Sequence, residues 1–120
     1  MVYVDRVETM NLLGLILQGL LFTNMRDPQK ARRIAGVKGD VLIRADRMRV
    51  TLRLRDGDVW ILRGEAGPPD AHVHGSLSAL LHVALGRGLF APALRGDLSA
   101  GGRIGMLLRL LPLLRVDDGG

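Results

Sequence analysis

The feature that most constrains the fold of this chain is a strict alternation of apolar and polar side chains over residues 48–55. The apolar positions are Met48, Val50, Leu52 and Leu54, and arginines and a threonine stand between and after them. Because successive side chains of a β-strand point to opposite faces, the alternation predicts a strand with one apolar and one cationic face. A sheet with one buried and one solvated face is typical of antiparallel strands.

Further strands are predicted on both sides of this segment. Asp46–Arg47 precedes it as a turn, and Asp56–Gly57 follows it as a dipeptide typical of β-hairpins. Pro68–Pro69 interrupts the pattern before a fourth strand, and we expect these four strands to run in antiparallel order. The predicted strands, with a short fifth, are residues 41–44, 48–55, 59–62, 71–74 and 95–101.

Apolar residues at helical spacing predict helices before and after the strands. The longest apolar run, Leu12–Phe22, is interrupted by a glutamine and two glycines and is shorter than the roughly 20 residues of a membrane-spanning helix. Asp27–Pro28 and Ser76 are start signals, and Pro112 is expected to kink or end the last helix. The predicted helices are residues 7–25, 29–35, 77–85 and 102–114.

Composition excludes several classes of protein. A chain of 120 residues with 48% apolar residues forms one core, and we expect residues 1–120 to be a single domain. Without cysteine there is no disulfide, zinc finger or thiol nucleophile, so a reducing, cytoplasmic location is expected. The net charge of +5 is compatible with nucleic acid, but the four aromatic residues do not interleave with the arginines. A base-stacking surface would therefore have too few parts, and no nucleic-acid partner is expected.

Metal and catalytic sites find little support. His72 and His74 would share one face of a strand and could form half a metal site, although a solvent-facing pair is the simpler interpretation. Ser76, His82 and Asp97 are the residue types of a catalytic triad, but the chain has neither a nucleophile-elbow motif nor a phosphate-binding loop. We expect no metal, no cofactor and no catalytic residue.

The cationic strand face has two interpretations. Arg49, Arg53 and Arg55 lie on it, and Arg44 and Arg63 could extend it. Such a row is usually the solvated face of a sheet. Alternatively it contacts an anionic membrane, where each base contributes about 1 kcal/mol.

The excess of leucine in the first and last helices also has more than one interpretation. Both helices are more apolar than a helix on one sheet face requires. The surplus could form an ordinary core or a homodimer interface, as in a protein-interaction module that uses Leu12–Phe22. It could instead surround a cavity for a lipophilic ligand.

The order of the predicted elements resembles that of the sterol carrier protein 2 family of lipid-binding domains. The resemblance extends to residues, because Gly39–Ile43 and Asp56–Val59 are similar to the first hairpins of the family. Gly64–Ser76 is similar to its connection into a helix, which ends on Gly-Ser. Leu94–Gly102 is similar to its late strand, which lies between glycines.

This resemblance covers about residues 8–115. It implies an α+β fold of order ααββββαβα, with a mostly antiparallel, five-stranded mixed sheet covered on one face by helices. It also implies a tunnel for a sterol, fatty acyl chain or other long lipid, and no catalysis. Related bacterial domains present lipophilic intermediates to enzymes of isoprenoid-quinone synthesis, which gives a second expectation. The chain is thus expected to be a single lipid-binding or lipid-transfer domain.

We therefore predict an apolar cavity between sheet and helices, with a lipophilic small molecule as the partner. Its predicted sheet positions are Val41, Ile43, Met48, Val50, Leu52, Val59 and Ile61. Its predicted helix positions are Leu77, Leu81, Ala84, Leu85, Met106, Leu107, Leu110 and Leu111. Membrane contact through Arg49, Arg53 and Arg55, a homodimer, and a small enzyme with a histidine in the cavity are left open.

Overall fold

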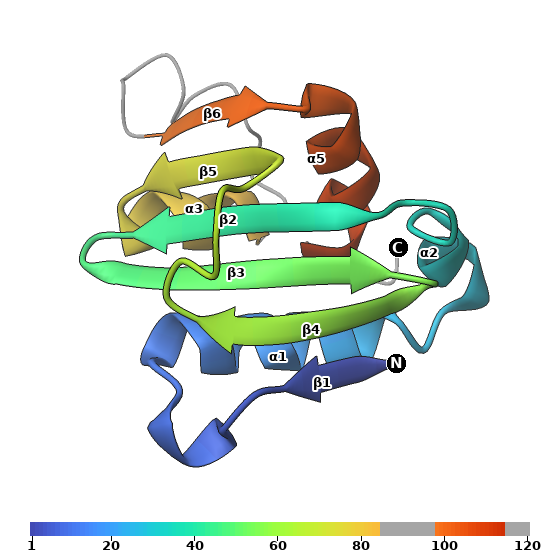
Figure 1. The fold of residues 1–120 in the computed structure, drawn as a ribbon, viewed down its shortest axis with the longest axis horizontal. Helices are drawn as coiled ribbons and strands as arrows, with labels where there is room; N and C mark the ends of the chain where they lie inside the picture. Colours follow the sequence, from blue (N-terminus) through green and yellow to red (C-terminus); the bar gives the residue numbers. More distant parts are fainter. Residues whose placement is uncertain (85–97, 115–120) are drawn as a thin grey trace.

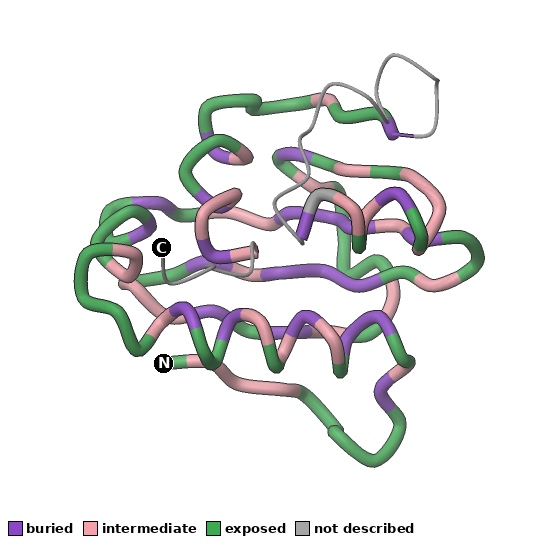
Figure 2. Tube along the Cα trace, turned by 180° about the vertical axis from the view of Figure 1, so that it is seen from behind, coloured by how far each residue is buried: buried purple, intermediate pink, exposed green. Residues whose placement is uncertain are grey.

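The computed structural model describes residues 1–84 and 98–114 and contains a six-stranded sheet with helices against one face (Figure 1). The strand order is β1-β4-β3-β2-β5-β6. The strands are β1 (Val2–Val4), β2 (Gly39–Ala45), β3 (Met48–Arg55), β4 (Asp58–Arg63), β5 (Ala71–Gly75) and β6 (Leu98–Gly102). The helices are η1 (Val7–Thr9), α1 (Leu12–Asn24), α2 (Pro28–Arg32), α3 (Leu77–Ala84), α5 (Ile104–Leu110) and η2 (Leu111–Leu114). Helices α1 and α3 lie behind the sheet in Figure 1 and in front of it in Figure 2.

Strands β2, β3 and β4 form the predicted antiparallel meander. Leu52 stands opposite both Val41 and Ile61, so the apolar positions of the three strands share the face toward the helices. The turn between β3 and β4 has positive φ values of 51° at Asp56 and 82° at Gly57. Two positive φ values are the requirement of a type I′ hairpin, which explains the Asp-Gly pair at this turn.

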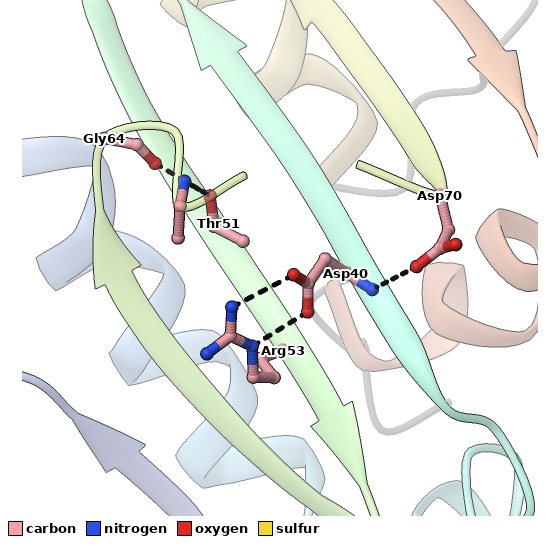
Figure 3. A network of polar contacts seen from close by, with 6 residues as sticks. Asp40, Thr51, Arg53, Gly64 and Asp70 are labelled. Carbon is pink, nitrogen blue, oxygen red and sulfur yellow. Dashed lines mark hydrogen bonds and ion pairs between the residues drawn. The ribbon is translucent and has the colours of Figure 1, made fainter. Parts of the chain in front are cut away.

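Strand β5 contradicts the expected antiparallel order, because it pairs parallel to β2. Residues 64–70 do not turn back beside β4 but cross the outer face of the sheet (Figure 1). There the Thr51 hydroxyl donates to the Gly64 carbonyl at 2.8 Å and accepts from the Ala66 N–H at 3.1 Å (Figure 3). The Asp40 N–H donates to the Asp70 carboxylate at 2.8 Å, and the Asp70 N–H donates to the Asp40 carbonyl at 2.9 Å. These bonds hold the first residues of β2 and β5 side by side, which makes the two strands parallel.

Strand β1 raises the strand count from the five expected to six. It pairs parallel to β4 at the sheet edge, where the Val59 N–H donates to the Met1 carbonyl at 2.9 Å. The N-terminal ammonium binds the Asp58 carboxylate at 2.6 Å. A strand of three residues has too few positions for an alternation to be recognised.

The first helix begins later than expected, at Leu12 rather than Val7. The Asn11 side chain caps it by accepting from the Gly14 N–H at 2.9 Å, which satisfies one of the free donors of the first turn. Residues Val7–Thr9 form a separate 3-10 turn.

The other helix signals are confirmed with shifted ends. Asp27 caps α2 by accepting from the Gln29 N–H at 3.0 Å, and the Ser76 hydroxyl accepts from the Ala79 N–H at 3.0 Å at the start of α3. The last helix ends at Leu110 and continues as the 3-10 helix η2, which contains Pro112. This is the helix end that a proline at this position favours.

The close-packed core lies under α1. Leu13, Leu17 and Leu21 point from α1 toward β3 and β4. The strand residues beneath them, including Leu52 and Ile61, are fully buried. Alternating buried and exposed positions along α1 are visible in Figure 2. This half of the helix-sheet interface therefore holds most of the buried core residues.

Candidate functional site

A cavity of about 160 Å³ lies in the other half of the interface between helices and sheet. Its floor is formed by β2, β5 and β6, and its walls by α1, α3, α5 and η2. The lining residues are Leu13, Ile16, Leu17, Leu20, Val41, Ile43, Val73, Leu80, Leu81, Ala84, Leu98, Ala100, Ile104, Leu107, Leu108, Leu110, Leu111 and Leu114.

Side-chain size along the sheet explains why the cavity lies where it does. Val73 of β5 stands opposite both Ile43 and Ala100, which places these three residues in one row of the inner face. The remaining inner positions of β5 and the end of β6 are alanine and glycine. On β3 and β4 the corresponding positions are mostly leucine, isoleucine and valine. The smaller side chains on β5 and β6 leave open space between sheet and helices. On β3 and β4 the larger side chains occupy the corresponding space.

Helix α1 serves both halves of the interface. Its Leu13 and Leu17 reach the core and the cavity, while Ile16 and Leu20 lie on its flank and face the cavity alone. The far end of α1 is tied to η2, because the buried Asn24 side chain donates to the Leu113 carbonyl at 2.6 Å. The helix therefore forms one fixed wall of the cavity.

Three large side chains of the lining are also exposed, as is the small Ala100, so the cavity opens to the surface where the large ones lie. Leu81, Ile104 and Leu108 are 37%, 47% and 55% exposed, respectively. We call these three residues of α3 and α5 the mouth.

The chemistry of the lining restricts the guest to hydrocarbon. Over the part of the chain that the structure describes, all eighteen lining residues are leucine, isoleucine, valine or alanine, so none of their side chains donates or accepts a hydrogen bond. Burial of an unpaired polar group costs about 2–7 kcal/mol. A headgroup would therefore remain outside the mouth while an aliphatic chain or ring entered.

The structure brings together seven of the fifteen predicted cavity residues, namely Val41, Ile43, Leu81, Ala84, Leu107, Leu110 and Leu111. Six others are buried in the core or pack against it without lining the cavity, namely Met48, Val50, Leu52, Val59, Ile61 and Met106. Leu77 also packs against this core, and Leu85 lies outside the described residues. A role in lipid binding stays a prediction for all of them.

Sequence reasoning missed the contributions of α1 and of β5 and β6. Ile16 and Leu20 carry a signal, since they widen the apolar stripe of α1 beyond the face that one sheet can cover. Val73 and Ala100 carry none, because only the register with β2 shows that they share its inner face.

The outer face of the sheet carries the predicted arginines. Arg53 forms a two-pronged ion pair with Asp40, with nitrogen–oxygen distances of 3.0 and 3.1 Å (Figure 3). The hydrogen bond to Asp40, and then the negative charge of Asp40, raise the pKa of Arg53 further above its ordinary value. Arg49 and Arg55 are exposed on this face. Arg63 does not extend the row, because it stands opposite Val50 at the end of the inner face, where it donates to the Thr9 carbonyl at 3.0 Å. Membrane contact through this face stays a prediction.

The three histidines lie away from the cavity lining. His72 and His74 pair with outer-face positions of β2, and His82 on α3 is not among the lining residues. Ser76 is used as a helix cap, and Asp97 lies outside the described residues. Within residues 1–84 and 98–114, no three histidine or carboxylate side chains gather as metal ligands would. Over the same residues, no helix has the length and apolarity that crossing a bilayer requires.

Comparison with known proteins gives one family and a consistent fold. The model of the SCP-2 sterol transfer family matches residues 18–115. A UbiJ-SCP2 ubiquinone synthesis protein superposes with a TM-score of 0.66 at 21% identity, covering 87% of this chain and 96% of its own. The sterol carrier protein domain 2 of Helicoverpa armigera has a TM-score of 0.66 at 14% identity, covering 95% and 97% of the two chains. Apo sterol carrier protein 2 from Yarrowia lipolytica has a TM-score of 0.61 at 15% identity and covers 92% of each chain.

A sequence search of curated proteins finds no significant match. The likenesses to solved structures, all at low identity, concern the fold. They agree with the expected α+β architecture of helices on one face of a mixed sheet.

Proposed function

Because the chain belongs to the SCP-2 sterol transfer family, we propose that it binds the hydrocarbon part of a lipid in the cavity described above. The lipid would be carried or presented without chemical change. The observation that supports this proposal most strongly is the lining, which is aliphatic at every described residue and ends in an exposed mouth at Leu81, Ile104 and Leu108.

The energetics of transfer require no reactive group. Each buried methylene gains about 0.8 kcal/mol relative to water, and a bilayer offers nearly the same gain. Exchange between bilayer and cavity is therefore close to balanced in free energy. The protein would act by covering the chain during desorption, which lowers the barrier.

The volume of the cavity sets the size of the guest. An engineered apolar cavity of about 150 Å³ binds benzene. The cavity of about 160 Å³ therefore has room for a guest of similar size. A longer chain would fit if the helices separated further or if the rest of the chain passed through the mouth.

Binding of a fluorescent fatty acid and of a fluorescent sterol to delipidated protein tests the proposal. We expect saturable uptake and, by native mass spectrometry, a mass increase that matches one guest. A homogeneous apo mass without uptake of either probe would contradict the proposal.

A matched pair of variants locates the binding site. Leu81→Arg places a charge at the mouth and is expected to lower uptake strongly. Leu12→Arg changes another exposed leucine, which does not line the cavity, and should leave uptake unchanged. Equal uptake by both folded variants would refute the assignment of the mouth.

A second role is the presentation of a lipophilic intermediate to enzymes of quinone synthesis. The likeness to the UbiJ-SCP2 ubiquinone synthesis protein favours it. Mass spectrometry of lipids extracted from the purified protein separates the two roles. Enrichment of isoprenoid-quinone precursors over phospholipid acyl chains supports presentation, and the reverse enrichment supports general lipid transfer.

A further inference from the structure

Charge is divided unequally between the two layers of the molecule. Helices α1, α3, α5 and η2 contain no aspartate or glutamate. The carboxylates of the neighbouring strands and turns, by contrast, include Asp40, Asp46, Asp56 and Asp58. Soluble surfaces normally intersperse both signs of charge. The four helices around the cavity, which lack carboxylates, are therefore suited to an apolar or anionic partner.

The mouth lies on two of these four helices, α3 and α5. Ile104 and Leu108 are four residues apart in α5, so they share one exposed face of the helix. The bases Arg103 and Arg109, both exposed, flank them in sequence. Leu81 of α3 adds a third exposed apolar side chain at the cavity opening. Apolar side chains beside arginines are the combination found at the surface of an anionic bilayer.

We propose that the mouth docks on an anionic lipid bilayer, with Ile104 and Leu108 entering the headgroup layer and Arg103 and Arg109 contacting lipid phosphates. This proposal rests on the proposed function and adds to it the surface that meets the membrane. A guest would then pass between bilayer and cavity without crossing water. The outer face of the sheet, with Arg49 and Arg55, would point away from the membrane.

Charge argues against a second copy of the chain as the occupant of this surface. A two-fold dimer built on the mouth would bring Arg103 and Arg109 of both copies together. The described helices around the mouth supply no carboxylate that could act as a counterion for these four cations. An anionic bilayer supplies one for each.

The chain carries its own reporter of orientation, since Trp60 is its only tryptophan. Trp60 lies on the outer face of the sheet, 41% exposed and stacked on Tyr3 with ring centroids 4.3 Å apart. In a Trp60→Phe background, Ile104→Trp moves the single indole to the mouth.

Acrylamide quenching of the two indoles, with vesicles of phosphatidylcholine containing phosphatidylglycerol, tests the orientation. We expect the indole at position 104 to shift its emission to the blue and to become severalfold less quenchable. Trp60 of the unaltered chain should keep its quenching constant. Protection of Trp60 instead would overturn the proposal in favour of the arginine face of the sheet.

Vesicle sedimentation with two matched double variants tests the charge contribution. Arg103→Gln with Arg109→Gln should weaken binding about thirtyfold at low salt, from the contribution of a base near an anionic surface. Arg49→Gln with Arg55→Gln removes the same charge from the sheet and should leave vesicle binding within about twofold. Equal losses in both pairs would overturn the proposal.

Two further measurements keep the outcome separate from that of the proposed function. Fatty-acid uptake without vesicles should be unchanged in both arginine pairs, since none of these residues lines the cavity. If the wild-type protein takes up fatty acid but does not bind anionic vesicles, docking is refuted and lipid binding in the cavity still stands. A concentration-dependent doubling of mass in light scattering, abolished by Leu108→Asp, would replace the bilayer with a second copy.

Discussion

Ala84→Leu is expected to raise stability and weaken lipid binding at the same time. Ala84 is a buried cavity-lining residue on α3, and leucine is nearly as good a helix former as alanine. The added carbons would therefore enter the cavity at little cost to the helix. Two opposite effects from one substitution distinguish an empty, guest-binding space from a packed core.

The magnitudes follow from the three carbons that the substitution adds. They displace about three methylenes of the guest, a loss of about 2.4 kcal/mol or about fiftyfold in Kd. In the free protein they fill space in a cavity of about 160 Å³, and filling of this kind commonly stabilises by about 0.5–2 kcal/mol.

Urea denaturation of the apoprotein and titration with a fluorescent fatty acid measure the two effects. Ala35→Leu is the matched control, because Ala35 is exposed, and should change stability by less than about 0.5 kcal/mol. A destabilised Ala84→Leu protein with unchanged affinity would refute the reasoning. That result is the one expected of an overpacked core, which costs about 1–3 kcal/mol.

Further predictions concern the frame of the cavity and the length of the guest. Gly102→Ala should lower the free energy of unfolding by about 2 kcal/mol or more, because φ is +78° and a Cβ would overlap the Asp70 carbonyl. Gly105→Ala, a helical glycine with open space around it, should instead stabilise by up to about 1 kcal/mol; equal urea midpoints would contradict both. Asn24→Leu should cost about 1–3 kcal/mol in urea denaturation, because the Leu113 carbonyl loses its donor, and an unchanged midpoint would refute this. In a series of fatty acids, Kd should fall about fourfold per methylene until the cavity is full and then level off; no dependence on length would speak against an aliphatic site.

Local patterns in the sequence predict those parts of the fold that depend on neighbouring residues. The alternation at residues 48–55 and the Asp56–Gly57 turn define the central hairpin, because both act over a few residues. Caps at Asp27 and Ser76 likewise act within one helical turn. The family resemblance adds the overall arrangement that these local patterns cannot supply.

The parallel pairing of β5 with β2 depends on contacts across 30 positions of the chain, between Asp40 and Asp70. Nothing local at Ala71–Gly75 shows which neighbour this strand will choose. The position of the cavity depends on that choice, because Val73 reaches the cavity floor only beside β2. The predicted sheet residues on β3 and β4 belong to the same apolar face, but α1 covers that half.

Methyl NMR spectroscopy with a spin-labelled fatty acid tests most directly whether the guest occupies the space between helices and sheet. Methyl groups of the cavity residues Ile16, Ile43 and Val73 should broaden on binding. Methyl groups of the core residues Ile34 and Ile61, which do not line the cavity, should broaden much less. Broadening confined to the surface of the molecule, or equal in both sets, would contradict a guest held in the cavity.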